Sequence, residues 1–345
     1  MMGSTEMLPT VPLTSSGPTT TVVGFGCADL FRIPSSTKRQ RLLGAAYDAG
    51  IRHFDVAPMY GLGVAEREVG AFARRHRDSV VIATKFGIAP TGAGRALGHV
   101  QAPIRMLFAE LPTLRDRVRS QAAGPASGRF GQMLYSAVGY TRASAQASLE
   151  NSLRELGTDH IDLFLLHDPM PHSVLAEELH DYLESERTAG RIRTWGIAGE
   201  PEPSWGVQKA FSRPVPVMQI RDDVFLRSLR RRSMADDSVG MITFGVFGRA
   251  LPRLVAHIIS DQERSRRWSE IVGADCTDRE TIASFLLRDA LRENRSGSVL
   301  ISTVHPWRLW AAAELATDLR EIDPALDRFL RLVRDELPSP SVSAE

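Results

Sequence analysis

The stretch "IDLFLLH", residues 161–167, is apolar over almost its whole length and ends in a histidine. A strand with one face in water alternates apolar and polar residues, whereas a strand buried on both faces reads as a continuous apolar run. Residues 161–167 are therefore predicted to form a central strand of a parallel sheet that is covered on both sides.

Seven similar runs surround this one in the sequence. They span residues 22–27, 52–58, 80–86, 193–199, 216–220, 241–247 and 298–304. The segments between them show helical spacing, as where Leu149, Leu153 and Leu156 share one helix face before Gly157. Eight strands that alternate with helices predict parallel pairing through right-handed crossovers, and eight such units close most naturally into a TIM (β/α)8 barrel.

A doubly wound open sheet is the competing fold. It usually carries a glycine-rich phosphate turn after its first strand. The matching stretch "GFGCAD", residues 24–29, has the first two glycines of that fingerprint but no third. The barrel is therefore the favoured prediction.

The chain is longer than a minimal barrel, and the excess length can be located. One domain is expected over residues 21–337, with a long insertion after the third strand at residues 88–140 and a C-terminal helical extension. Residues 1–20 are rich in Ser, Thr and Pro and are expected to be a disordered tail. Residues 338–345 are expected to be frayed.

The 88–140 insertion lies on the predicted catalytic face, and its role is open. It contains six arginines against Glu110 and Asp116, together with Met106, Phe108, Met133, Tyr135 and Tyr140. One interpretation is a lid that shapes the substrate pocket and favours an anionic or bulky substrate. The other is a surface excursion or an oligomer contact.

The bulk composition is that of an ordinary globular protein. Apolar residues make up 43% of the chain, charged residues 24%, and the net charge is +1. Neither nucleic acid nor a membrane is an expected partner, because there is no strong overall charge and no apolar run of about 18 residues. The N-terminus does not resemble a signal peptide, and Cys27 and Cys276 have no metal or redox spacing. A cytoplasmic location is expected, and the oligomeric state is open.

Four polar residues fall at the C-terminal ends of predicted strands, where TIM barrels carry their chemistry. Asp55, Lys85 and His167 end three different strands, and Tyr60 lies on the loop after the second. An ammonium near a phenol favours the phenolate and so makes the phenol a better proton donor. Together the four residues could polarise a carbonyl and protonate the resulting alkoxide. They have no metal-binding spacing, and the electrons must come from a hydride carrier.

Taken singly, each of these residues has an ordinary structural explanation. Asp55 could be a turn residue, Lys85 a surface lysine and His167 a buried core histidine. The prediction depends on four independent placements at one rim of the barrel.

The sequence resembles the aldo-keto reductase family from about residue 22 to residue 320. The resemblance lies in "FDVAPMYG", "ATKFG", "SLENSLRELGTDHIDLFLLHDP" and "GRIRTWGIAG", which occur in family order. It implies a TIM barrel that binds NADP(H), or less often NAD(H), and a catalytic role for Asp55, Tyr60, Lys85 and His167. The form of the motifs is most similar to the branch with bacterial aldose and pyridoxal dehydrogenases.

The resemblance also assigns cofactor contacts. It implies that Gln219 holds the nicotinamide amide, that Phe244 stacks on the ring, and that Arg308 binds the 2′-phosphate, which a guanidinium suits. The remaining positions are Gly24, Phe25, Phe247, Gly248 and Arg249.

Two departures from the family pattern concern the same cofactor. Ala198 and Gly199 replace a Ser–Asn pair, so the amide contact is lost or made by another residue such as Glu200. Ala311 and Ala312 replace a Glu–Asn pair near the adenine.

The predicted function is hydride transfer between nicotinamide and a small carbonyl or alcohol substrate, with Tyr60 as general acid and base. A close alternative is oxidation of a sugar hemiacetal or alcohol by the same residues. An alternative of another class is a nucleotide-sensing or regulatory subunit with little turnover, because fold alone does not fix function. The sequence leaves the substrate and the physiological direction open.

Overall fold

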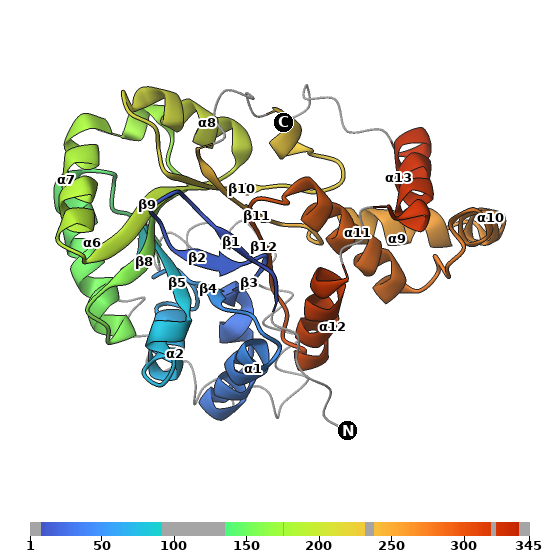
Figure 1. Ribbon diagram of the computed structural model, residues 1–345, viewed down its shortest axis with the longest axis horizontal. Helices are drawn as coiled ribbons and strands as arrows, with labels where there is room; N and C mark the ends of the chain where they lie inside the picture. Colours follow the sequence, from blue (N-terminus) through green and yellow to red (C-terminus); the bar gives the residue numbers. More distant parts are fainter. Residues whose placement is uncertain (1–7, 92–134, 175, 232–237, 319–321, 338–345) are drawn as a thin grey trace.

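The computed structural model describes residues 8–91, 135–174, 176–231, 238–318 and 322–337. Eight parallel strands close into one barrel, in the order β10-β11-β12-β3-β4-β5-β8-β9 (Figure 1). The strands are β3 (Val23–Gly26), β4 (His53–Asp55), β5 (Val81–Phe86), β8 (Ile161–His167), β9 (Ile192–Gly199), β10 (Val217–Arg221), β11 (Gly240–Phe244) and β12 (Ser298–Ile301). Each coincides with one of the eight predicted runs, so the TIM barrel is confirmed and the open sheet is excluded.

Helices surround the barrel and cover its outer face (Figure 1). They are α1 (Ser36–Asp48), α2 (Val64–Ala73), α6 (Arg142–Leu156), α7 (Ala176–Thr188), α8 (Pro201–Ala210), α11 (Arg279–Glu293) and α12 (Pro306–Thr317). Side chains alternate along β8: Leu163 and Leu165 face the interior, whereas Phe164 and Leu166 pack outward against the helices. Both faces are dry, which explains why this strand is apolar throughout.

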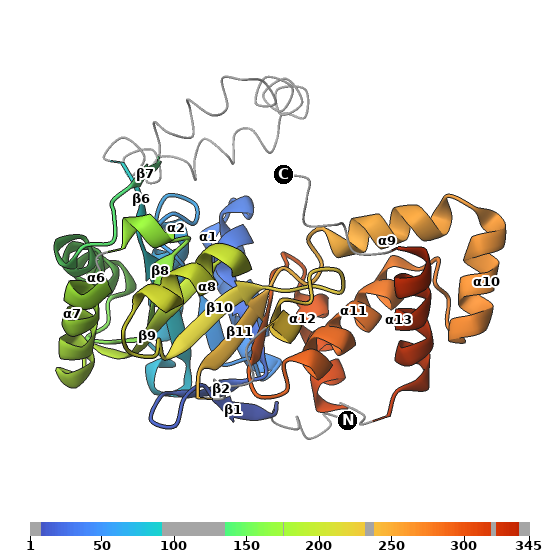
Figure 2. The ribbon, with the colours of Figure 1, turned by 90° about the horizontal axis from the view of Figure 1, so that it is seen from above.

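A hairpin of β1 (Thr10–Pro12) and β2 (Thr19–Thr21) lies across the N-terminal end of the barrel (Figure 2). Leu13 from its turn joins the core inside the barrel, and Leu8 and Val11 are also buried. The expectation of a disordered tail over residues 1–20 is therefore wrong for residues 8–20. The composition suggested a tail, but these few apolar side chains close the open bottom of the barrel.

The 88–140 insertion begins and ends as a small ribbon on the opposite side of the barrel (Figure 2). β6 (Ile88–Pro90) pairs antiparallel with β7 (Tyr135–Ala137). Residues 92–134, which include Met106, Phe108 and Met133, lie outside the described residues, so the lid interpretation is not tested.

A second addition is a lobe beside the barrel, built from α9 (Ala250–Ile259), α10 (Gln262–Val272) and α13 (Pro324–Glu336) (Figure 1). The Glu336 carboxylate accepts hydrogen bonds from Arg267 at 2.6 Å and from the Trp268 indole at 3.1 Å. The expected C-terminal helical extension is thereby fastened to the residues that follow β11. Within the described part of the chain, none of these helices is long and apolar enough to cross a membrane.

Glu66 places a carboxyl group in the buried contact between α2 and the barrel. Its side chain is fully buried and accepts a hydrogen bond of 2.8 Å from the hydroxyl of Thr84, on the outer face of β5. Burial raises the pKa of Glu66 from 4.5 to about 7. Because the unfolded chain ionises this carboxyl at lower pH than the folded protein does, stability falls as the pH rises from 4.5 through about 7.

We expect Glu66→Gln to stabilise the protein by about 1–3 kcal/mol at pH 8, because Gln keeps the acceptor for Thr84 and cannot ionise. At pH 4.5 the variant and the wild type should differ much less. Urea unfolding at the two pH values measures this. A gain that is equal at both would contradict the assigned ionisation.

Candidate active site

The strand register brings three of the four predicted catalytic residues to one end of the barrel interior. Asp55 lies opposite Ala83 in the pairing of β4 with β5. Ala83 and Leu165 belong to the inner core, so Lys85 and His167, each two residues further on, face the same interior. All three stand at the C-terminal ends of their strands, as the sequence predicts.

Lys85 and Asp55 form a buried ion pair at the floor of this end. The Lys85 Nζ lies 2.7 and 2.8 Å from the two Asp55 carboxylate oxygens and 3.0 Å from the carbonyl of Val56. Burial by itself would lower the pKa of Lys85, but Asp55 and Tyr60 outweigh it, so the pKa is raised. The lysine therefore remains an ammonium, fixed in position by its acceptors.

Tyr60 reaches the ion pair from a tight loop after β4. Gly61, Leu62 and Gly63 all have positive φ values, of 60°, 60° and 88°, which turn the chain sharply before α2. The Tyr60 hydroxyl accepts a hydrogen bond of 3.3 Å from the Lys85 ammonium. The loop thus places the phenol oxygen over the cation.

The pKa of Tyr60 is the net result of opposing effects. Burial raises it most, Lys85 opposes that effect, and Asp55 adds to it, so the pKa lies above 10.0. The Lys85 ammonium, the one effect predicted from the sequence, lowers the pKa as expected but does not outweigh burial. The phenol consequently stays protonated and can donate a proton.

His167 completes the group in the neutral form. Burial, and then the charge of Lys85, lower its pKa from 6.5 to about 3. Its ring meets the Tyr60 ring edge-on, with the ring centroids 6.0 Å apart. The hydroxyl of Tyr140, from the end of the insertion, donates to the His167 carbonyl and fixes the strand end. A neutral imidazole can donate one N–H to a substrate oxygen beside the phenol.

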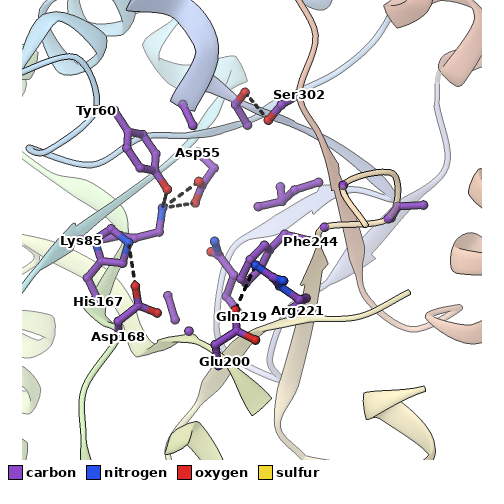
Figure 3. Close-up of a pocket in the computed structure, with 18 of the residues that line it drawn as sticks. Asp55, Tyr60, Lys85, His167, Asp168, Glu200, Gln219, Arg221, Phe244 and Ser302 are labelled. Carbon is purple, nitrogen blue, oxygen red and sulfur yellow. Dashed lines mark hydrogen bonds and ion pairs between the residues drawn. The ribbon is translucent and has the colours of Figure 1, made fainter. Parts of the chain in front are cut away.

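These residues line one wall of a cavity of about 420 Å³ at the mouth of the barrel (Figure 3). The opposite wall carries Gln219 from β10 and Phe244 from β11. The Oε1 atom of Gln219 is buried and has no hydrogen-bond partner in the described structure. A buried acceptor that faces a cavity is suited to an N–H donor on a ligand.

A second cavity of about 440 Å³ adjoins the first. Asp29, Phe247, Gly248 and Ser302 line both cavities. Arg308, in the first turn of α12, lines only the second cavity. Phe247, Gly248 and Arg308 are thus placed along one continuous hollow, together with Gln219 and Phe244.

Three predicted cofactor residues are not brought to this hollow. Phe25 is buried among the outer core residues and packs against Phe54, because alternation along β3 turns it away from the interior. Gly24 lies deeper in the barrel, where a Cβ would come within 2.5 Å of Leu300. Arg249 is exposed at the start of α9 and lines neither cavity.

Sequence reasoning missed two charged residues at the rim of the first cavity. Arg221 forms an ion pair of 3.0 Å with Glu200 (Figure 3). Glu200, which the sequence suggested as a contact for the nicotinamide amide, is therefore paired with Arg221. Asp168 has a left-handed backbone (φ 50°), and its N–H donates to the carbonyl of Ala198 at 2.7 Å. A Cβ at Gly199 would lie 2.7 Å from the Asp168 carboxylate. In the sequence, the feature that could have indicated Asp168 is its position directly after His167, the histidine that ends β8.

Comparison with known proteins gives a consistent result. The model of the Aldo/keto reductase family matches residues 22–236. The chain is 31% identical over 190 residues to D-threo-aldose 1-dehydrogenase of Pseudomonas sp, covering 51% of this chain and 49% of that one. It is also 31% identical over 265 residues to pyridoxal 4-dehydrogenase of Microbacterium luteolum, covering 69% and 71%. The chain therefore spans only about half the length of the first of these relatives.

Solved structures share the whole fold at low sequence identity. A glycerol dehydrogenase from Gluconobacter oxydans superposes with a TM-score of 0.67 at 16% identity, covering 97% of this chain and 98% of that one. An aldo-keto reductase from Klebsiella pneumoniae in complex with NADPH gives 0.63 at 18% identity, with the same coverage. Because the family model matches residues 22–236, which is more than half of the chain, the chain belongs to the aldo-keto reductase family.

Proposed function

We propose that this protein is an NADP(H)-dependent oxidoreductase that transfers a hydride between nicotinamide and a carbonyl or alcohol substrate. The observation that carries the proposal is Lys85, which bridges Asp55 and the hydroxyl of Tyr60 at the floor of the first cavity. Because the phenol is protonated and the cation is held beside it, Tyr60 is suited to act as general acid in reduction.

The residues present fit a nicotinamide cofactor. The orphaned Oε1 of Gln219 suits the carboxamide N–H, and Phe244 offers a ring face across the cavity from Tyr60. Gly245 has φ 91°, and Gly248 lies beyond it, so the backbone there has few side chains in the way of a phosphate. When bound, the reduced nicotinamide supplies the hydride to the carbonyl carbon.

The chain's own residues would manage the proton and the charge. The neutral His167 would donate an N–H to the carbonyl oxygen and orient it toward the phenol. The Tyr60 hydroxyl would pass its proton to the carbonyl oxygen of the substrate as that oxygen gains negative charge. The phenolate left behind would be stabilised by the Lys85 ammonium, 3.3 Å away, which Asp55 keeps charged.

Oxidation of a sugar hemiacetal or alcohol is the second candidate, because the same residues can catalyse the reverse reaction with the Tyr60 phenolate as general base. The names of the relatives, an aldose dehydrogenase and a pyridoxal dehydrogenase, favour it. A cytoplasmic location is part of the proposal and is supported by two buried free thiols, Cys27 and Cys276.

A substrate panel in both directions tests the proposal. Carbonyls with NADPH or NADH, and alcohols and aldoses with the oxidised cofactors, are followed by nicotinamide absorbance. Turnover in either direction supports hydride transfer. Tight cofactor binding with no turnover on any substrate would contradict it and favour a nucleotide-sensing role.

We expect NADPH to bind more tightly than NADH, because the Arg308 guanidinium can make charge-assisted hydrogen bonds to a 2′-phosphate. Arg308→Met should weaken NADPH binding by about tenfold or more, the scale of one hydrogen bond to a charged group, and change NADH binding little. Fluorescence titration measures both, with the exposed Arg266→Met as the control. Equal dissociation constants for the two cofactors in the wild type would contradict the NADP(H) assignment.

A further inference from the structure

The second cavity has a charge pattern that the proposed cofactor preference leaves unexplained. Besides Arg308 it is lined by Arg279, Glu280 and Trp307, from the first turns of α11 and α12. An ion pair of Arg32 with Asp29 lines the same cavity, so three guanidinium groups and two carboxylates surround it. A carboxylate is not expected in a site built only for a phosphate, because like charges repel.

Glu280 is bound directly to the residue expected to hold the phosphate. Its Oε1 lies 2.6 Å from the nearest Arg308 guanidinium nitrogen, and the two side chains are 40% and 38% exposed. The Arg308 guanidinium also lies over the Trp307 ring, 5.0 Å from its centroid. The remaining Nε of Arg308 is buried and has no partner within the described residues. The guanidinium is therefore already engaged before any ligand arrives.

The backbone holds Glu280 firmly in this place. The carboxylate of Asp278 caps α11 by accepting from the backbone N–H groups of Glu280 and Thr281, at 3.3 and 2.9 Å. Glu280 is consequently fixed in the first turn of α11, facing α12 across the cavity. Its contact with Arg308 joins two elements rather than two neighbours on one helix.

We propose that Glu280 is a specificity-determining residue that narrows the preference for NADP(H) over NAD(H); this rests on the proposed function. A 2′-phosphate can engage Arg308 fully only after displacing the Glu280 carboxylate, and it then lies close to that negative charge. A ribose 2′-hydroxyl instead finds in Glu280 an acceptor, the arrangement by which an acidic residue selects NAD(H) in other nucleotide sites. Arg32, Arg279 and Arg308 outnumber Asp29 and Glu280, so the net charge of the cavity lining stays positive and the phosphate is still favoured.

Glu280→Gln tests this role, because Gln removes the charge while keeping the size and a carbonyl acceptor. We expect the ratio of the dissociation constants of NADH and NADPH to rise by about two- to fivefold, the scale of one exposed ion pair. Most of the change should be tighter NADPH binding. The exposed Glu263→Gln on α10 removes the same charge outside both cavities and should leave the ratio unchanged.

Nucleotide fragments separate this effect from catalysis. Binding of 2′,5′-ADP and of 5′-ADP is measured by calorimetry in the wild type, Glu280→Gln, Arg308→Met and the double variant. We expect Glu280→Gln to tighten only 2′,5′-ADP binding, and to do so less when Arg308 is already replaced. Thermal unfolding of each variant verifies that it is folded.

Two negative results have different meanings. If Arg308→Met weakens 2′,5′-ADP binding but Glu280→Gln leaves it unchanged, the role of Glu280 is refuted and the NADP(H) assignment stands. If Arg308→Met has no effect and the two fragments bind equally, the 2′-phosphate site is not here, and both proposals on cofactor preference fail.

Discussion

Tyr60→Phe is expected to lower turnover by about 10² or more, the range for loss of a general acid or base. The substitution removes only the hydroxyl that accepts a hydrogen bond from Lys85, and the ring that faces His167 is kept. Cofactor dissociation constants should change by less than about twofold, because Gln219, Phe244 and Arg308 are untouched. Single-turnover measurement of hydride transfer, together with fluorescence titration of the cofactor, tests both expectations.

Tyr47→Phe is the matched control for this variant. The hydroxyl of Tyr47 lies 3.1 Å from that of Ser79 on the exposed outer side of α1, outside both cavities. Its loss should leave turnover unchanged. Wild-type turnover in Tyr60→Phe would refute the assignment of Tyr60 as the proton donor.

Lys85→Met is expected to affect activity and stability together. Without the ammonium, the Asp55 carboxylate is left buried and uncompensated, which costs about 3–5 kcal/mol when one partner of a buried pair is removed. Turnover should fall by about 10² or more, since a phenolate at Tyr60 would no longer be stabilised. Urea unfolding measures the first effect and single-turnover kinetics the second.

The double variant Asp55→Asn/Lys85→Met separates the two effects. Because Asn carries no charge, it should recover much of the lost stability while activity remains low. If the double variant also regained activity, the ion pair would serve only the fold and not the chemistry. Unchanged stability in Lys85→Met alone would show that Asp55 is not held as a buried anion.

Much of the architecture could be predicted because buried parallel strands leave a direct trace in the sequence. Runs such as residues 161–167 are apolar on both faces, and each predicted run became a barrel strand. Asp55, Lys85 and His167 could be predicted with them, since a polar side chain at the end of such a strand can face only the barrel mouth or the helices. Phe25 shows the limit of this reasoning, because the motif suggested a contact that strand alternation does not permit.

The hairpin over residues 10–21 could not be predicted by the same route. Its Ser, Thr and Pro content is typical of a tail, and its few apolar side chains gain burial only from a barrel that is already formed. Local pattern carries no information about such a partner. The same applies to Asp168, whose left-handed backbone and proximity to Gly199 follow from the packing of two strand ends.

The sequence by itself determined the barrel and the family, and it singled out the four residues that we propose as the catalytic group, because each follows from a local pattern or a motif. Only the tertiary structure decided how the charges are balanced. Burial raises the pKa of Tyr60 against the effect of Lys85, and it keeps His167 neutral. Glu280 meets Arg308 across two helices, 28 residues apart in the chain. Desolvation and contacts between distant residues depend on the folded packing, which the linear order does not contain.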